Sequence, residues 1–285
     1  MALQPRPGIM EIAAYVGGEA SIPGVDRVLR LASNENPLGP SPRAMEAYRE
    51  LADELHRYPD GGATALRESI AEVYGLDASR IVCGAGSDEL ISLLTRAYAG
   101  PGDEVLYSRH GFLMYPISAK GVGARPVAVA ERNLCADVDA LLEAVNEHTR
   151  ILFLANPNNP TGSYLPASEV ERLQAGLPES VLLVIDAAYA EYVEAADYEA
   201  GVRLVENCEN VVMTRTFSKI HGLAALRLGW AYCSPAVADV LNRLRGPFNV
   251  SAPALAAGVA AIRDQDYVAQ CRDSIRRARA AFVEG

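Results

Sequence analysis

The sequence predicts an α/β fold in which a largely parallel sheet lies between layers of helices. Helical and strand patterns alternate along most of the chain, and two expected strands, 151–154 and 181–185, are apolar at every position. Strands of this kind are buried on both faces, as they are when helices cover both sides of a sheet. Half of the 285 residues are hydrophobic, which is enough for a large core.

The first part of the chain is expected to be irregular. Residues 1–35 are rich in glycine and proline and are predicted to form an N-terminal arm and the start of a small domain. Ser41, followed by Pro42, is a favourable N-cap for a helix that extends to about residue 56. The Arg-Tyr-Pro-Asp-Gly-Gly run at 57–62 then breaks this helix.

From residue 64 the expected elements alternate. Helices are predicted at 64–74, 88–98, 114–120, 137–147 and 167–174, and strands at 80–83, 104–107, 125–130, 150–155, 181–186, 211–215 and 227–233. A helix at 235–245 follows, and Ser251 with Pro253 begins one long helix from about residue 252 to the end. We therefore expect a large domain at 36–250, with residues 251–285 leading into a C-terminal small domain of which this chain holds only a part.

Composition argues against several classes of protein. The formal charge of −10 and the pI near 5.0 do not suit a nucleic-acid partner. The chain begins without an apolar leader and has no run of apolar residues long enough to span a membrane, so we expect a cytoplasmic protein. Its five cysteines include no Cys-x-x-Cys pair, so neither a disulfide framework nor a metal site is expected.

Polar residues follow several of the expected strands, at the sheet edge where α/β proteins bind ligands. The glycines at 84 and 86 and the helix start at Ser87 and Asp88 would offer free backbone N–H groups to a phosphate, although an ordinary N-cap explains them equally well. The asparagine-rich run 156–162 is either a surface turn or a source of an amide donor for a bound ring.

Two further strand ends carry ionisable groups. Asp186 ends a buried strand and needs a partner such as a protonated ring nitrogen, with Tyr189 near the same ring; a helix cap with a rim tyrosine is the alternative. Lys219 follows an apolar strand and lies near Arg227, and an amine in such surroundings loses proton affinity and becomes nucleophilic. A solvated loop lysine is the alternative in that case.

Together these strand ends offer an amine, a carboxylate, a phenol, an amide and a phosphate cradle, which is the set that pyridoxal 5′-phosphate requires. The chain resembles the class I and II aminotransferases of the aspartate-aminotransferase fold (pyridoxal-phosphate fold type I). Within this family it is most similar to the members that act on L-histidinol phosphate. The motifs that carry the resemblance lie at 34–39, 57–59, 86–89, 156–162, 186–189, 218–219 with Arg227, and 246–251.

The resemblance implies roles for individual residues. Lys219 would form the Schiff base with pyridoxal 5′-phosphate and move the substrate proton. Asp186 would pair with the ring nitrogen, and Asn159 and Tyr189 would hydrogen-bond the ring oxygen. The remaining cofactor contacts would come from Gly86, Ser87, Asp88, Thr216, Ser218 and Arg227 around the phosphate and from Phe112 on the ring face.

The resemblance also implies partners. Tyr15, Asn34 and Tyr58 would contact substrate, and Tyr58 would reach the cofactor phosphate of a second subunit, so a homodimer is expected. The implied reaction takes the amino group from L-histidinol phosphate to 2-oxoglutarate, as in histidine biosynthesis. The alternatives are an aromatic or broad-specificity aminotransferase, a related phosphate-bearing amino-acid decarboxylase, or a remnant of the fold with little turnover. Ala225 departs from the family pattern, where glycine is common.

Overall fold

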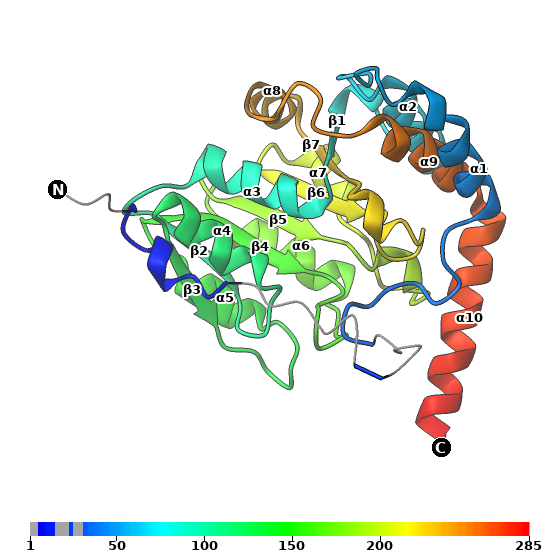
Figure 1. Ribbon diagram of the computed structural model, residues 1–285. Helices are drawn as coiled ribbons and strands as arrows, with labels where there is room; N and C mark the ends of the chain where they lie inside the picture. Colours follow the sequence, from blue (N-terminus) through cyan, green and yellow to red (C-terminus); the bar gives the residue numbers. More distant parts are fainter. Residues whose placement is uncertain (1–4, 15–22, 25–30, 285) are drawn as a thin grey trace.

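The computed structural model describes residues 5–14, 23–24 and 31–284. A seven-stranded sheet in the order β1-β7-β6-β5-β4-β2-β3 forms its centre (Figure 1). The strands are β1 (Ile81–Gly84), β2 (Glu104–Ser108), β3 (Arg125–Val129), β4 (Thr149–Ala155), β5 (Leu182–Asp186), β6 (Val211–Thr216) and β7 (Gly229–Cys233). The predicted α/β fold with a mostly parallel sheet is confirmed, because β2 to β6 pair in parallel and only the pairings made by β7 are antiparallel.

The reversed strand β7 determines which residues share an edge of the sheet. Since β7 is antiparallel to both β1 and β6, those two strands point the same way as β4 and β5. The ends of β1, β4, β5 and β6 therefore lie together with the start of β7. We call the end of the sheet where these strand ends meet the carboxyl edge, and the other end of the sheet the opposite edge.

Helices cover both faces of the sheet, as the apolar strands predict. In β4, Ile151 and Phe153 pack into one buried cluster, whereas Leu152 and Leu154 pack into another. The first cluster includes residues of α3 (Ser87–Tyr98), α4 (Met114–Val122) and α8 (Pro235–Leu244). The second includes residues of α2 (Thr64–Tyr74), α5 (Val138–Ala144), α6 (Ala167–Gly176), α7 (Val202–Asn207) and α9 (Ala252–Arg263).

Two predicted helices differ from the structure. Helix α1 (Pro42–Glu50) begins as expected, with Ser41 Oγ accepting from the Ala44 N–H at 3.1 Å, but it ends before a short 3-10 turn at Ala52–Glu54. The single final helix was also wrong, because α9 and α10 (Gln265–Glu284) separate at Asp264, whose φ and ψ of −85° and 65° are not helical.

The break at Asp264 follows from what each helix buries. The alanine-rich face of α9 packs into the large core against α1 and α2, whereas α10 buries Val268 and Cys271 beside Ile220. The chain must change direction to reach both, and Figure 1 shows α10 leading away from the helices grouped at that end of the sheet. The proposed domain limits 1–35, 36–250 and 251–285 remain predictions.

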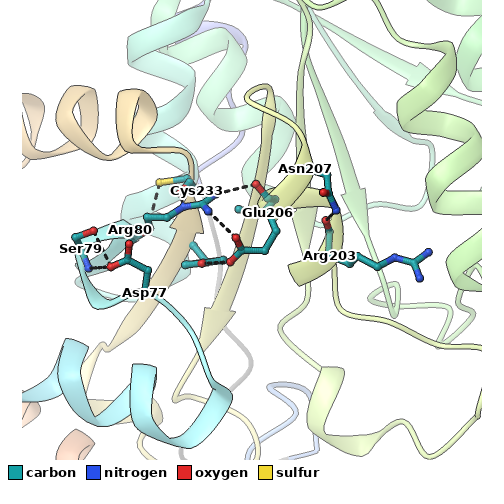
Figure 2. Close-up of polar contacts among 9 residues, drawn as sticks. Asp77, Ser79, Arg80, Arg203, Glu206, Asn207 and Cys233 are labelled. Carbon is teal, nitrogen blue, oxygen red and sulfur yellow. Dashed lines mark hydrogen bonds and ion pairs between the residues drawn. The ribbon is translucent and has the colours of Figure 1, made fainter.

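A polar cluster centred on Arg80 fastens the opposite edge (Figure 2). Arg80 Nη1 lies 2.8 Å from Glu206 Oε2, Nε donates to the Cys233 carbonyl at 2.9 Å, and Nη2 donates to the Val205 carbonyl at 2.7 Å. The guanidinium also lies over the ring of Tyr232, which itself donates to Glu206. We call these residues the Arg80 cluster; they join the start of β1 to α7 and to the end of β7.

The part of the chain that the structure describes holds no helix long and apolar enough to cross a membrane. The same part holds no group of three or more histidine, cysteine or acidic residues arranged to bind a metal ion.

Candidate active site

A cavity of about 230 Å³ opens at the carboxyl edge, where the sequence predicts the site. Ten of the predicted site residues line it, namely Ser87, Asp88, Phe112, Asn159, Asp186, Tyr189, Thr216, Ser218, Lys219 and Arg227. They come from the ends of several strands and from the start of α3, so the topology of the sheet brings them together. Ser33 and Glu35 also line the cavity, although the sequence analysis did not assign them to the site.

Lys219 lies just beyond β6 with its amine inside the cavity. Its Nζ donates to the Ser33 carbonyl at 3.1 Å and lies over the ring of Tyr189, 5.5 Å from the centroid. Burial lowers the pKa of the Lys219 amine, and the positive charge of Arg227 lowers it further, while nearby carboxylates oppose the change. The amine is therefore easier to deprotonate than an ordinary lysine, as a nucleophile requires.

Asp186 is the last residue of β5 and is almost fully buried. Tyr115 donates its hydroxyl to Oδ2 at 2.8 Å, and Oδ1 accepts weaker bonds from the Ala188 N–H at 3.3 Å and the Thr214 hydroxyl at 3.4 Å. Burial raises the pKa of Asp186 to about 6, while these hydrogen bonds oppose the rise. At neutral pH the site thus holds a buried carboxylate suited to a cationic ligand group.

An anion cradle lies between the start of α3 and Arg227. The Arg227 guanidinium donates to Ser218 Oγ at 3.2 Å and to Asp88 Oδ2 at 3.0 Å. Backbone N–H groups at the helix start and an arginine together favour a phosphate. Two glycines permit this close approach: a Cβ on Gly86 would lie 2.5 Å from Arg227 Nη2, and one on Gly229 would lie 2.5 Å from the Ser87 nitrogen.

The asparagines of the 156–162 run divide between structure and site. Asn156 bonds the backbone of Leu165 through both side-chain atoms, and Asn158 donates to Thr161 and to a backbone carbonyl. Asn159 instead lines the cavity. Across from it, Tyr189 accepts a hydrogen bond from Asn34 Nδ2 at 3.0 Å, and burial raises the pKa of the Tyr189 phenol, so this phenol stays protonated.

Two other predicted site residues, Tyr58 and Asn34, lie outside this cavity. Tyr58 does not line the cavity; its ring is 82% exposed and stacks on Phe248 at 4.6 Å between centroids. Tyr15 lies outside the described residues. Asn34 lines a second cavity of about 940 Å³, which adjoins the first at Tyr189 and is bounded on its far side by Arg272 and other residues of α10.

Sequence reasoning missed the buried support beneath the site. Tyr115 donates a hydrogen bond to Asp186 directly. Arg215, four residues before Lys219, pairs with Glu191 at 2.7 Å, and the side chains of Arg215 and Glu191 are each only 6% exposed. A signal for Tyr115 was present, because it follows Phe112 by three residues at the start of an apolar helix. A tyrosine on the buried face of a helix needs a hydrogen-bond partner.

Comparison with known proteins places these features in a family. A family model described as "Aminotransferase class I and II" matches residues 26–285. A histidinol-phosphate aminotransferase of Rhodospirillum centenum is 64% identical over 279 residues, which are 98% of this chain and 77% of that protein. One of Paramagnetospirillum magneticum is 66% identical over 268 residues, which are 94% of this chain and 74% of that protein.

Solved structures agree with the fold. The histidinol-phosphate aminotransferase of Sinorhizobium meliloti in complex with pyridoxal-5′-phosphate superposes with a TM-score of 0.84 at 33% identity, covering 87% of this chain and 68% of that one. An aspartate aminotransferase of Thermus thermophilus gives a TM-score of 0.80 at 23% identity, covering 89% of this chain and 71% of that one, a likeness of fold alone.

Proposed function

Because the chain belongs to the class I and II aminotransferases, we propose that it transfers the amino group of L-histidinol phosphate to 2-oxoglutarate with pyridoxal 5′-phosphate as cofactor. The observation that carries this proposal is the joining of Lys219, buried Asp186 and the Arg227 cradle in one cavity. The names of relatives at 64% and 66% identity support the choice of amino donor.

The residues of the cavity fit this cofactor. Its ring nitrogen would take the buried carboxylate of Asp186, which has only neutral hydrogen-bond donors in the structure. Its phosphate would take the cradle, where the absence of a Cβ at Gly86 and Gly229 lets Arg227 and the start of α3 come close together. Phe112 would cover the ring face, and Asn159 and Tyr189 would bond the ring oxygen. When bound, the cofactor supplies an electron sink that makes the substrate Cα–H acidic.

The chain supplies the proton chemistry. Lys219 Nζ, whose pKa is lowered, releases its proton more readily than an ordinary lysine. It can then hold the cofactor and later carry the proton of the substrate Cα. Tyr189 lies beside that amine and, held by Asn34, orients the reacting groups. The larger cavity adjoining Tyr189 is the place for the rest of the substrate, and arginines of α10 on its far side suit an anionic group.

We also propose that the enzyme works as a homodimer in the cytoplasm. Tyr58, Phe248 and Leu55 are large apolar side chains with 82%, 46% and 67% of their surface exposed. Such exposure favours a protein interface, and Tyr58 would extend from it toward a second subunit. Sedimentation of the purified chain should give twice the monomer mass of 30.5 kDa, and a purely monomeric species would contradict this part of the proposal.

The substrate assignment is tested by adding L-histidinol phosphate or L-phenylalanine to the purified protein loaded with pyridoxal phosphate. We expect histidinol phosphate to bleach the visible band of the cofactor, with kcat/KM at least about 100-fold above that for phenylalanine, because specific polar contacts discriminate strongly. Equal rates would favour an aromatic or broad-specificity enzyme. Release of CO₂ from phenylalanine, the only one of the two amines with a carboxyl group, would favour a decarboxylase. A cofactor band that ignores both amines would favour the remnant.

A further inference from the structure

The first turn of α4 and the residues just before it contribute to the wall of the cavity and to the layer that packs against this wall. Phe112, just before this helix, lines the cavity, and Tyr115 follows one turn later. The two rings meet edge to face with centroids 5.9 Å apart, and the Tyr115 N–H donates to the Phe112 carbonyl at 3.1 Å. One short segment therefore places both an aromatic ring at the cavity wall and a phenol beneath it.

Tyr115 is itself held firmly. It is 1% exposed, and its ring stacks on Phe153 of β4 with centroids 4.6 Å apart and planes within 3°. This packing leaves its hydroxyl a fixed position, from which it donates to Asp186 Oδ2 at 2.8 Å. The other two donors to Asp186 lie at 3.3 and 3.4 Å, so the phenol makes the shortest of the three bonds.

We propose that Tyr115 is a positioning residue for the reaction, which orients the Asp186 carboxylate and keeps it ionised for the cofactor ring. This inference rests on the proposed function, since it assumes that Asp186 meets a cationic ring nitrogen. A hydrogen bond to the charged form of a buried carboxylate stabilises that form over the neutral acid. Without the Tyr115 hydroxyl, Asp186 would keep a proton at neutral pH and compete poorly for the ring.

Tyr115 remains a donor throughout the useful pH range. Burial raises the pKa of its phenol well above the usual value, and the negative charge of Asp186 raises it further. The other ionisable groups whose charge reaches Asp186 or Tyr115 lie on neighbouring elements and are Asp88 at the start of α3, Tyr189 and Tyr198 after β5, and Lys219 after β6. None of them takes the place of the hydroxyl at Oδ2.

The test compares Tyr115→Phe with Tyr107→Phe. Tyr107 is a matched control, because its ring packs edge-on against Tyr115 at 6.3 Å between centroids while its hydroxyl is not among the donors to Asp186. The pKa of Asp186 is measured in the cofactor-free protein by ¹³C NMR of the carboxyl carbon, assigned with Asp186→Asn. Dissociation constants for pyridoxal phosphate are then measured from pH 5 to pH 9.

We expect Tyr115→Phe to raise the pKa of Asp186 by about one to two pH units, because a hydrogen bond to a charged group contributes about 1.5 to 3 kcal/mol. The cofactor should bind about threefold to tenfold more weakly at pH 7 and equally well near pH 9, where Asp186 is ionised in both proteins. Tyr107→Phe should leave both quantities unchanged. Equal pKa values for Asp186 in Tyr115→Phe and in the wild type would overturn the proposal.

A second variant guards against a folding defect. Replacing Tyr115 by 3,5-difluorotyrosine keeps the ring and makes the hydroxyl a stronger donor, so the pKa of Asp186 should fall, a change of opposite sign. A rise or no change would contradict the proposal. Because the NMR measurement needs neither cofactor nor substrate, a lack of turnover with histidinol phosphate would refute the proposed function while leaving this test intact.

Discussion

Asp186 and Lys219 at the carboxyl edge are held differently from Arg80 at the opposite edge. At the opposite edge, Arg80 bonds a carboxylate and two backbone carbonyls and lies over an aromatic ring. At the carboxyl edge, Asp186 is buried among neutral donors, and the nearby Lys219 amine donates to a backbone carbonyl instead. Arg80 thus has a carboxylate partner within the chain, whereas Asp186 accepts from neutral donors. Under the proposed function, the cofactor ring would supply a cationic partner for Asp186.

The difference has a thermodynamic consequence. The pKa of Asp186 is raised to about 6 in the folded protein from an ordinary value of 3.8. Between these values the folded state binds more protons than the unfolded state, so stability decreases as pH rises through this window. The ionised Asp186 thus destabilises the cofactor-free fold above pH 6. The Arg80 cluster instead stabilises the fold, since removing its guanidinium would take a donor away from two part-buried carbonyls.

The largest effect is expected from Lys219→Ala. Loss of the amine should reduce transamination by on the order of 10⁴-fold or more, because it removes both the proposed nucleophile and the proposed proton carrier. Stability should not decrease, since the half-buried amine gives up only its hydrogen bond to the Ser33 carbonyl. The control is Lys120→Ala, which removes the chain's other lysine and should retain full activity. Substantial turnover by Lys219→Ala would refute its assigned role.

A substitution in the Arg80 cluster should lower stability and leave activity unchanged. Arg80→Met keeps the aliphatic stem but removes three polar contacts, and we expect it to lower the free energy of unfolding by about 2 to 3 kcal/mol. Urea denaturation measures this change, and kcat/KM should stay within about twofold of the wild-type value, as for a site remote from the chemistry. Arg243→Met is the control: its pair with Asp239 is largely exposed, so a loss below about 0.5 kcal/mol is expected.

Arg227→Met should change cofactor binding and the pH profile together. We expect pyridoxal phosphate to bind about 10-fold to 100-fold more weakly, because an arginine to phosphate contact is lost. Arg227 also lowers the pKa of Lys219, so its removal should raise that pKa and move the rise of activity to higher pH. A pH profile of kcat/KM at saturating cofactor measures the shift. A profile that moves to lower pH would contradict the electrostatic explanation.

The smallest expected effect is a gain in stability. It tests whether the charge at the carboxyl edge destabilises the cofactor-free fold. Asp186→Asn removes the buried charge and should stabilise the cofactor-free protein by about 1 to 2 kcal/mol at pH 8, less than the roughly two-unit rise in its pKa allows. The gain should shrink toward pH 5, where Asp186 is increasingly protonated. Urea denaturation at both pH values tests this. A loss of stability at pH 8 would show that the ionised Asp186 does not destabilise the cofactor-free fold.

The sequence was informative wherever local pattern and topology agree. The apolar strands predict a sheet covered on both faces, and the residues after the strands predict the cavity at the carboxyl edge, with Lys219, Asp186 and Arg227 among its lining. This works because parallel strands bring their ends together whatever their distance along the chain. The resemblance to aminotransferases then indicated the type of reaction, and the names of the relatives at 64% and 66% identity support that prediction.

The parts that sequence reasoning missed depend on packing between distant elements. The break at Asp264 arises because α9 and α10 bury different faces, which a continuous helical pattern does not reveal. The bond from Tyr115 to Asp186 joins residues 71 positions apart, and the stacking of the Tyr115 ring on Phe153 helps to fix its direction. The structural role of Asn156 and the place of Asn159 in the cavity wall likewise depend on the tertiary fold, because the two residues belong to one polar run.

Locating the residue to which the cofactor attaches tests the assignment of Lys219 directly. Borohydride reduction of the protein loaded with pyridoxal phosphate fixes the cofactor to the amine that holds it, and peptide mass spectrometry locates it. The chain contains only two lysines, so the result is unambiguous. We predict a single pyridoxyl group on Lys219. A label on Lys120 or on the amino terminus, or no label, would contradict the assignment of the carboxyl edge as the catalytic site.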